Sequence, residues 1–183
     1  MYIDQTRYIT TPDAAGRLEK EMAVYRLLEQ LQMPFIRVDH DAANTIEDCA
    51  AVEQVLGTPI CKNLFLRNRQ ATSFYLLLLP GKKRFVTRNF SRQLGISRTS
   101  FAEAEYMKKY LNITPGSVSI LGLMNDTERK VQLIIDKELF KEKQLGFHPC
   151  INTSSLSLSL SDLLEKFLPY TGHTFTEIEL SEE

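Results

Sequence analysis

The chain has 183 residues, of which 43% are hydrophobic and 25% charged, and this composition excludes disordered, collagen-like and coiled-coil proteins. The net charge of −1 conceals an uneven distribution, because residues 54–102 carry nine bases and no acid. Such a stretch in a nearly neutral protein is typical of a surface that binds phosphate groups, unless folding scatters its charges over several faces.

The cysteines indicate the compartment. The chain has three cysteines, Cys49, Cys61 and Cys150, and no two of them have CxxC spacing. This argues against a disulfide framework and against structural zinc. A reducing, cytoplasmic location is therefore expected. Residues 1–17 lack the basic start and apolar core of a secretory signal. The longest apolar run, at residues 74–79, is far shorter than the roughly 20 residues of a membrane helix, so no membrane association is expected.

The predicted elements begin with a helix over about residues 14–33, whose apolar residues recur three and four positions apart. A strand follows at 35–38, and a loose capping box at Thr45–Asp48 predicts a helix to about Leu56. The later elements are strands at 62–66, 73–79 and 85–87, a helix capped at 100–103 and ending at 111, a strand at 131–135, a short helix at 136–140, an extended segment at 151–158, a helix from Ser161 to 168, and a strand at 174–180.

This order of elements predicts the fold class. Hairpins and helical crossovers both occur, and no linker or repeat divides the chain. We therefore expect one compact α/β domain over residues 1–183. It should have a mixed, largely antiparallel, barrel-like sheet of about seven strands surrounded by about five helices.

Common catalytic signatures are absent from the sequence. There is no Gly-x-Ser-x-Gly elbow, no His-Glu-x-x-His pair, no P-loop and no dinucleotide fingerprint. An enzyme that depends on a metal or a cofactor is therefore not expected. Taken singly, the remaining polar residues favour ordinary structural roles: Lys62 as an edge lysine, Cys61 as a core residue, and His148 as a histidine held before a proline.

Four short segments gain meaning from their order and spacing. They are Lys62–Leu66 (KNLFL), Arg98–Ala102 (RTSFA), Pro115–Ser119 (PGSVS) and Gly146–Pro149 (GFHP), the last followed by Asn152 and Thr153. Together they resemble the YbaK-like aminoacyl-tRNA editing domains, which include the editing domains associated with prolyl-tRNA synthetase. Within that family they resemble most the ProX/PrdX-type trans-editing branch. The resemblance runs from about residue 18 to residue 180.

The resemblance implies roles for particular residues. Lys62, Gly116 and Ser117 match the family's catalytic positions. The implied substrate-binding residues are Asn63, Arg98, Val118, Ser119, His148, Asn152 and Thr153. His148 matches a histidine that lines the substrate site in alanine-specific members. Ile120 stands where the family commonly has proline, which leaves the rigidity of that loop open.

The function implied is hydrolysis of mischarged tRNA, with alanine on proline tRNA as the favoured substrate and cysteine or serine as alternatives. Water attacks the activated ester, so no side-chain nucleophile and no cofactor are required. The expected partners are the tRNA acceptor end, bound by Lys82, Lys83, Arg84 and Arg88 of the basic stretch, and prolyl-tRNA synthetase.

Two other interpretations stay open on the sequence. One is a non-catalytic tRNA- or synthetase-binding module of the same fold. The other is a thiol hydrolase that uses Cys61 or Cys150 together with His148.

Overall fold

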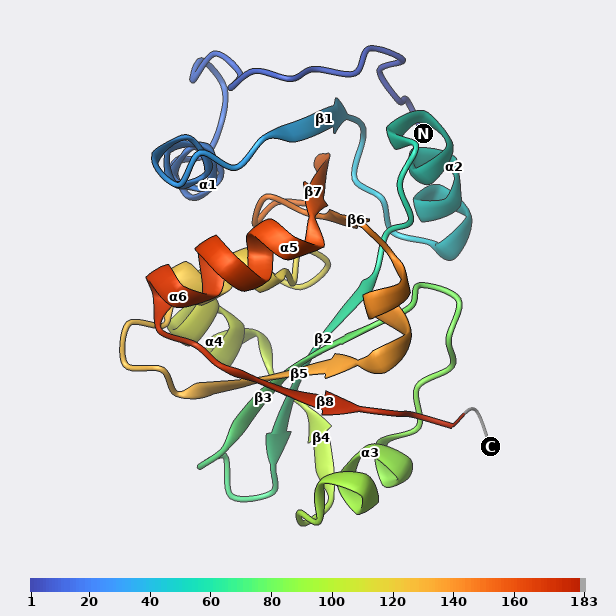
Figure 1. Cartoon of the computed structure of the whole chain (residues 1–183), viewed down its shortest axis with the longest axis vertical. Coiled ribbons are helices and arrows are strands. Elements are labelled where there is room, and N and C mark those ends of the chain that lie inside the picture. Colours follow the sequence, from blue (N-terminus) through green and yellow to red (C-terminus); the bar gives the residue numbers. More distant parts are fainter. Residues whose placement is uncertain (182–183) are drawn as a thin grey trace.

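The computed structural model describes residues 1–181, which form two β-sheets with helices packed around and between them (Figure 1). The three-stranded antiparallel sheet has the order β1 (Phe35–Asp39), β7 (Ser154–Ser159) and β6 (Gln144–Phe147). The five-stranded mixed sheet has the order β4 (Thr99–Phe101), β2 (Lys62–Asn68), β3 (Phe74–Leu79), β5 (Val131–Asp136) and β8 (Phe175–Ile178). The α/β class is confirmed, but the strands form two sheets that do not close into a barrel.

The helices are short. They are α1 (Glu19–Gln30), α2 (Ile46–Leu56), α3 (Thr87–Leu94), α4 (Ala104–Tyr106), α5 (Leu160–Asp162) and α6 (Leu168–Thr171). Wider helical turns at Met107–Leu111 and Leu163–Phe167 extend α4 and α5, and 3₁₀ turns occupy Ile120–Asn125 and Lys137–Lys141. Within residues 1–181, none of these helices is long and apolar enough to cross a membrane.

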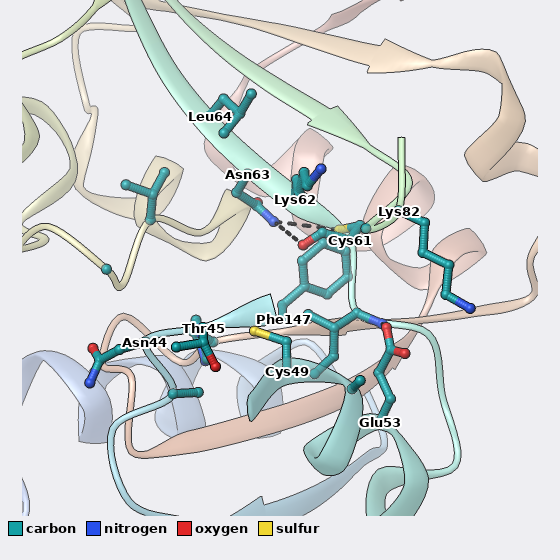
Figure 2. A pocket seen from close by; sticks show the side chains of 17 residues that line it. Asn44, Thr45, Cys49, Glu53, Cys61, Lys62, Asn63, Leu64, Lys82 and Phe147 are labelled. Carbon is teal, nitrogen blue, oxygen red and sulfur yellow. Dashed lines mark hydrogen bonds between the residues drawn. The ribbon is translucent and has the colours of Figure 1, made fainter. Parts of the chain in front are cut away.

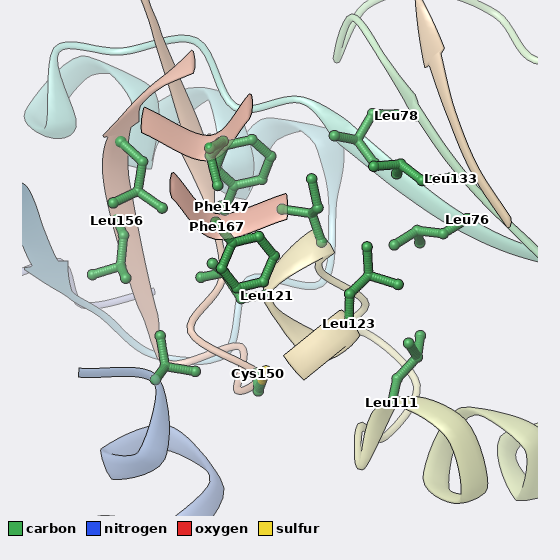
Figure 3. Close-up of a cluster of buried hydrophobic side chains, with 14 of the residues drawn as sticks. Leu76, Leu78, Leu111, Leu121, Leu123, Leu133, Phe147, Cys150, Leu156 and Phe167 are labelled. Atoms are coloured by element: carbon green, nitrogen blue, oxygen red, sulfur yellow. The ribbon is translucent and has the colours of Figure 1, made fainter. Parts of the chain in front are cut away.

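The main core lies between the two sheets. Phe147 and Leu156 from the smaller sheet and Leu76 and Leu133 from the larger sheet belong to one buried cluster, which also includes Phe167, Leu121 and Leu123 (Figure 3). A second cluster covers the opposite face of the larger sheet, where α3 packs. Strand β3 contributes to both clusters, and all six of its side chains are buried between β2 and β5. This confirms the predicted strand at 73–79, and its unbroken apolar run is accounted for by burial on both faces.

Helix α2 begins as the sequence predicts. The Thr45 hydroxyl accepts a hydrogen bond from the Asp48 amide at 3.0 Å, and the Asp48 carboxylate accepts from the Thr45 amide at 3.1 Å. The helix ends at Gly57, whose φ of 71° is the left-handed conformation that favours glycine. The residues at both ends of α2 therefore account for where the helix begins and where it ends.

Several local predictions are wrong. The expected strand at 85–87 is the approach to α3, and the expected capping box at 100–103 is not formed, because Ser100 lies in β4. The helix that was expected to begin at Ser161 is α5, and Ser159 caps it. The first helix starts at Glu19, five residues later than predicted, because residues 14–17 form a turn.

Candidate active site

A cavity of about 350 Å³ lies between α2 and the beginning of β2. Its other walls come from the turn after β3, the loop at residues 116–118 and the end of β6. Figure 2 shows Cys49 and Glu53 of α2 on one side and Lys62 and Asn63 of β2 on the other, with Phe147 between them. Much of the lining is apolar, so charged groups inside it are screened weakly.

The structure brings together the central residues of the sequence prediction. The cavity is lined by Lys62, Asn63, Gly116, Val118 and His148, which are widely separated in sequence. Lys82, predicted as a tRNA contact, also lines it. This convergence comes from three of the four segments that carry the resemblance.

Lys62 is half-buried, and its ammonium is fixed in place. Its Nζ donates a hydrogen bond of 2.6 Å to the backbone carbonyl of Lys83. A lysine ammonium has three donors, so two remain available for a ligand. The carbonyl lies in the turn after β3, and this turn therefore sets where the positive charge stands.

Asn63 is held on both sides of its amide. Its Oδ1 accepts a hydrogen bond of 2.9 Å from the backbone amide of Ile120. Its Nδ2 donates to the carbonyl of Cys61 at 3.2 Å and approaches the Cys61 sulfur at 3.4 Å (Figure 2). Both N–H donors and one lone pair are thus used within the protein, which makes Asn63 a brace between β2 and the loop that precedes Ile120.

The loop at residues 116–118 presents backbone amides to the cavity. Gly116 has a φ of +87°, which residues with a Cβ rarely adopt. The Ser117 amide donates to the Thr114 carbonyl at 3.1 Å, and its side chain is buried. Within residues 1–181 the amides of Gly116 and Val118 have no hydrogen-bond acceptor, and both residues line the cavity. The available donors are therefore at Gly116 and Val118, not at Ser117.

His148 is oriented by hydrogen bonds to β7. Its Nδ1 lies 2.9 Å from the Ser154 carbonyl, which can only accept, so Nδ1 carries the proton and Nε2 is the acceptor in the neutral ring. The Ser155 hydroxyl lies 3.4 Å from the same Nδ1 and 2.9 Å from Nε2 of buried His40. Burial lowers the pKa of His148, which favours the neutral form. His148 thus offers an acceptor from a fixed ring.

Other predicted substrate-binding residues lie outside the cavity lining. Ser119 is fully buried and its hydroxyl accepts from the Leu121 amide, so it caps a 3₁₀ turn. Asn152 lies close to Gly116: a Cβ atom added to this glycine would lie 3.4 Å from Asn152 Nδ2. Thr153 is exposed, and its carbonyl accepts from the His40 amide. Arg98 is exposed beside edge strand β4, which pairs with the far end of β2.

The predicted basic surface loses one member. Lys83 is buried, and its Nζ pairs with Asp136 at 2.9 Å and with Glu138 at 2.7 Å. A lysine with two carboxylate partners is not available to phosphate, so its proposed tRNA contact is corrected to a structural role. Lys82, Arg84 and Arg88 are exposed and have no carboxylate partner within residues 1–181.

Sequence reasoning missed the contribution of α2. Thr45, Cys49 and Glu53 are spaced by four residues, so they lie along one face of the helix, and all three line the cavity. Glu53 Oε1 accepts a hydrogen bond of 2.8 Å from the Ile60 amide. The spacing was visible in the sequence, but nothing in it showed that this face borders a cavity.

The thiols are poorly suited to nucleophilic chemistry. Burial raises the pKa of Cys61 and of Cys150 to about 12, so the thiolate is scarce at neutral pH. Cys49 is half-buried, and burial raises its pKa as well. Within residues 1–181, no group of three or more His, Cys, Asp or Glu residues is placed to hold a metal ion. The cavity therefore offers a fixed cation, backbone donors and a neutral imidazole.

A mixed α/β fold with this cavity and these segments defines an aminoacyl-tRNA editing domain. The family model for the aminoacyl-tRNA editing domain matches residues 40–166, and the chain belongs to this family. The predicted enzyme class, an aminoacyl-tRNA deacylase, is confirmed.

Individual relatives agree with this assignment. The chain is 31% identical over 163 residues to the prolyl-tRNA editing protein ProX of Acetoanaerobium sticklandii, covering 89% of this chain and 99% of the relative. It is 28% identical over 181 residues to prolyl-tRNA synthetase associated domain-containing protein 1 of Danio rerio, covering 94% and 96%. A solved structure described as "a putative trans-editing enzyme for prolyl tRNA synthetase" shares the fold, with a TM-score of 0.67, 16% identity, and coverage of 91% and 100%.

Proposed function

We propose that this protein acts in trans to remove alanine from mischarged proline tRNA. The observation that carries the proposal is the convergence of Lys62, Asn63, Gly116, Val118 and His148 on one cavity. The relative ProX bears the name of a prolyl-tRNA editing protein, which supports proline tRNA as the nucleic acid. The rest of the proposal rests on the chemistry of an aminoacyl ester.

In the proposed reaction, water attacks the carbonyl carbon of the ester. The bond from that carbon to the ribose 3′ oxygen breaks, the oxygen takes up a proton, and the free amino acid leaves. The amides of Gly116 and Val118 are the donors for the carbonyl oxygen as it gains charge. The Lys62 ammonium stabilises the same charge or the phosphate near the 3′ end. The ribose 2′ hydroxyl of the tRNA helps to position the water.

Selectivity is proposed to come from exclusion by size. A site shaped for alanine rejects proline by overpacking, whereas each missing methylene in a smaller residue forfeits only about 1–3 kcal/mol. His148, held by the Ser154 carbonyl, forms part of the wall. Its neutral ring also offers an acceptor without introducing a second positive charge beside Lys62.

The tRNA acceptor end is proposed to reach the cavity across Lys82, Arg84 and Arg88. Lys82 lines the cavity, and all three side chains are exposed. Exposed cations without carboxylate partners are suited to phosphate contacts. Prolyl-tRNA synthetase is the proposed second partner, as the source of the mischarged tRNA, and a cytoplasmic location fits both partners.

The proposal is tested by a deacylation panel. Proline tRNA charged with alanine, serine, cysteine or proline is incubated with the protein, and the loss of the ester is followed, with and without prolyl-tRNA synthetase. We expect fastest hydrolysis of the alanine ester and protection of the proline ester. Fastest hydrolysis of the cysteine or serine ester would reassign the substrate. Hydrolysis of none of the esters would contradict the proposed function.

A further inference from the structure

Glu53 contributes a carboxylate to the lining of the cavity. It is half-buried on α2, and among residues 1–181 it is the one carboxylate that lines the cavity. Its Oε1 accepts the hydrogen bond from the Ile60 amide, which fixes the orientation of the carboxylate. No lysine, arginine or histidine in the described part of the chain lies within ion-pair distance of it.

The two lysines that line the cavity form no ion pair with Glu53. Lys62 donates to the Lys83 carbonyl, and Lys82 is exposed at the rim. Apolar side chains such as Ile60, Leu64 and Phe147 make up much of the remaining lining. Glu53 therefore keeps one hydrogen bond, from the Ile60 amide, and a ligand that carries a positive charge could supply charge-assisted hydrogen bonds to it.

We propose that Glu53 binds the α-ammonium group of the aminoacyl ester. This inference rests on the proposed function, because the ammonium is the cationic group of an alanine ester. The other polar groups of the cavity are less suited to it. Lys62 repels a cation, and the Asn63 amide has one free lone pair after its contacts with Cys61 and Ile120. Nε2 of His148 is the rival acceptor, but it is neutral.

The inference predicts that the enzyme requires a free amine. An N-acetylated aminoacyl ester keeps the side chain, the ester and the tRNA, but it loses the positive charge. Placed beside Glu53, the acetyl group would leave the carboxylate without a partner. The enzyme should therefore hydrolyse alanyl-tRNA faster than N-acetyl-alanyl-tRNA, and Glu53 should be the source of most of that preference.

The experiment is a two-by-two cycle of enzyme and substrate. Wild-type protein and Glu53→Gln are each assayed on alanyl-tRNA and on N-acetyl-alanyl-tRNA. The glutamine retains an oxygen that accepts from the Ile60 amide, so the fold is expected to hold, and a thermal melt checks this. Glu47→Gln is the matched control, because Glu47 lies on the same helix but is exposed and outside the cavity lining.

We expect the wild-type preference for the free amine to fall about tenfold or more in Glu53→Gln, the range for a hydrogen bond between charged groups, and to stay unchanged in Glu47→Gln. An unchanged preference in Glu53→Gln would overturn the inference. If that preference instead disappears in His148→Ala, the ammonium binds at His148.

A binding measurement separates this inference from the proposed function. The non-hydrolysable amide 3′-alanylamido-3′-deoxyadenosine is titrated into each protein and followed by NMR. If wild-type protein deacylates no tRNA, the proposed function fails, yet tighter binding of this amide to wild-type protein than to Glu53→Gln would still support the ammonium site. Equal binding, or no binding to either protein, would overturn it.

Discussion

Replacing Lys62 by methionine should abolish most of the deacylase activity while leaving the protein folded. Methionine keeps an unbranched apolar stem and removes only the ammonium. The Lys62 hydrogen bond to the Lys83 carbonyl is 2.6 Å long, and such a bond from a charged donor contributes about 1.5–3 kcal/mol. This is a part of the roughly 5–15 kcal/mol that stabilises a domain, so the melting temperature should fall without loss of the fold.

The loss of activity should be much larger than the loss of stability suggests. Two of the three ammonium protons are free to act on the ester or on the nearby phosphate. Removing one preorganised donor from an oxyanion site lowers the rate about 10²–10³-fold. The measurement is single-turnover hydrolysis of alanyl-tRNA at equal concentrations of folded enzyme. Circular dichroism at the assay temperature confirms that the folded fractions match.

Lys82→Met is the control for this experiment. Lys82 lines the same cavity, but it is exposed and lacks the hydrogen bond that fixes Lys62. Its loss should weaken tRNA binding and spare the rate at saturating tRNA. If Lys62→Met matches wild-type turnover, or if both variants lose only affinity, Lys62 does not stabilise the transition state and the proposed mechanism is wrong.

Three further outcomes follow from the site. Charge reversal at Lys82, Arg84 and Arg88 should weaken tRNA binding. The slope of log K against log salt concentration should become shallower by about 0.7–0.9 for each phosphate that the protein no longer neutralises. An affinity for tRNA that does not change with salt concentration would contradict the proposal that these residues bind phosphates. His148→Ala should change the ranking of alanine, serine and cysteine esters, whereas a uniform loss would identify His148 as a proton-transfer group. Alkylation of Cys49 should slow hydrolysis by filling the cavity, and inhibition that persists in Cys49→Ala would revive the thiol mechanism.

The elements predicted correctly are those whose cause is local. The unbroken apolar run of β3 needs burial on both faces, and the capping box and Gly57 define α2 from its own residues. Helix α3 was missed because it is only eight residues long and has two apolar residues, Phe90 and Leu94, so a single pair spaced by four is all that the sequence shows of a helical pattern. Tertiary contacts decide its place, including the bond of 3.1 Å between the hydroxyls of Ser91 and Thr99.

The failed capping box shows the same competition. Ser100 and Glu103 have the spacing of a capping box, but both residues instead interact with Arg67 of β2. Ser100 pairs with Arg67 in the sheet, and the Glu103 carboxylate accepts from the Arg67 guanidinium at 2.7 Å. A capping box predicted from local spacing does not form here, because its serine pairs with a strand and its glutamate pairs with an arginine from a distant part of the sequence.

Some residues of the candidate site could be predicted from short sequence segments, and others could not. Lys62, Gly116 and His148 were found because short segments resemble a family, and the fold then brings them to one cavity. Glu53 and Lys83 could not be assigned from the sequence. One acts as a cavity carboxylate and the other as a buried cation, and both depend on segments distant along the chain: β5 and its following turn for Lys83, and the walls of the cavity for Glu53.

The isoleucine at position 120 illustrates how such a departure from a family pattern is resolved by the structure. Proline at this position would fix φ but would have no N–H to donate. Ile120 supplies that N–H to Asn63 Oδ1, and its side chain is buried in the core. The loop that carries Gly116 and Val118 is therefore tied to β2 through Asn63, beside Lys62. A hydrogen bond and core packing hold the backbone at Ile120, as the ring of a proline would. This hydrogen bond connects β2, which carries Lys62, to the loop that carries the amides of Gly116 and Val118.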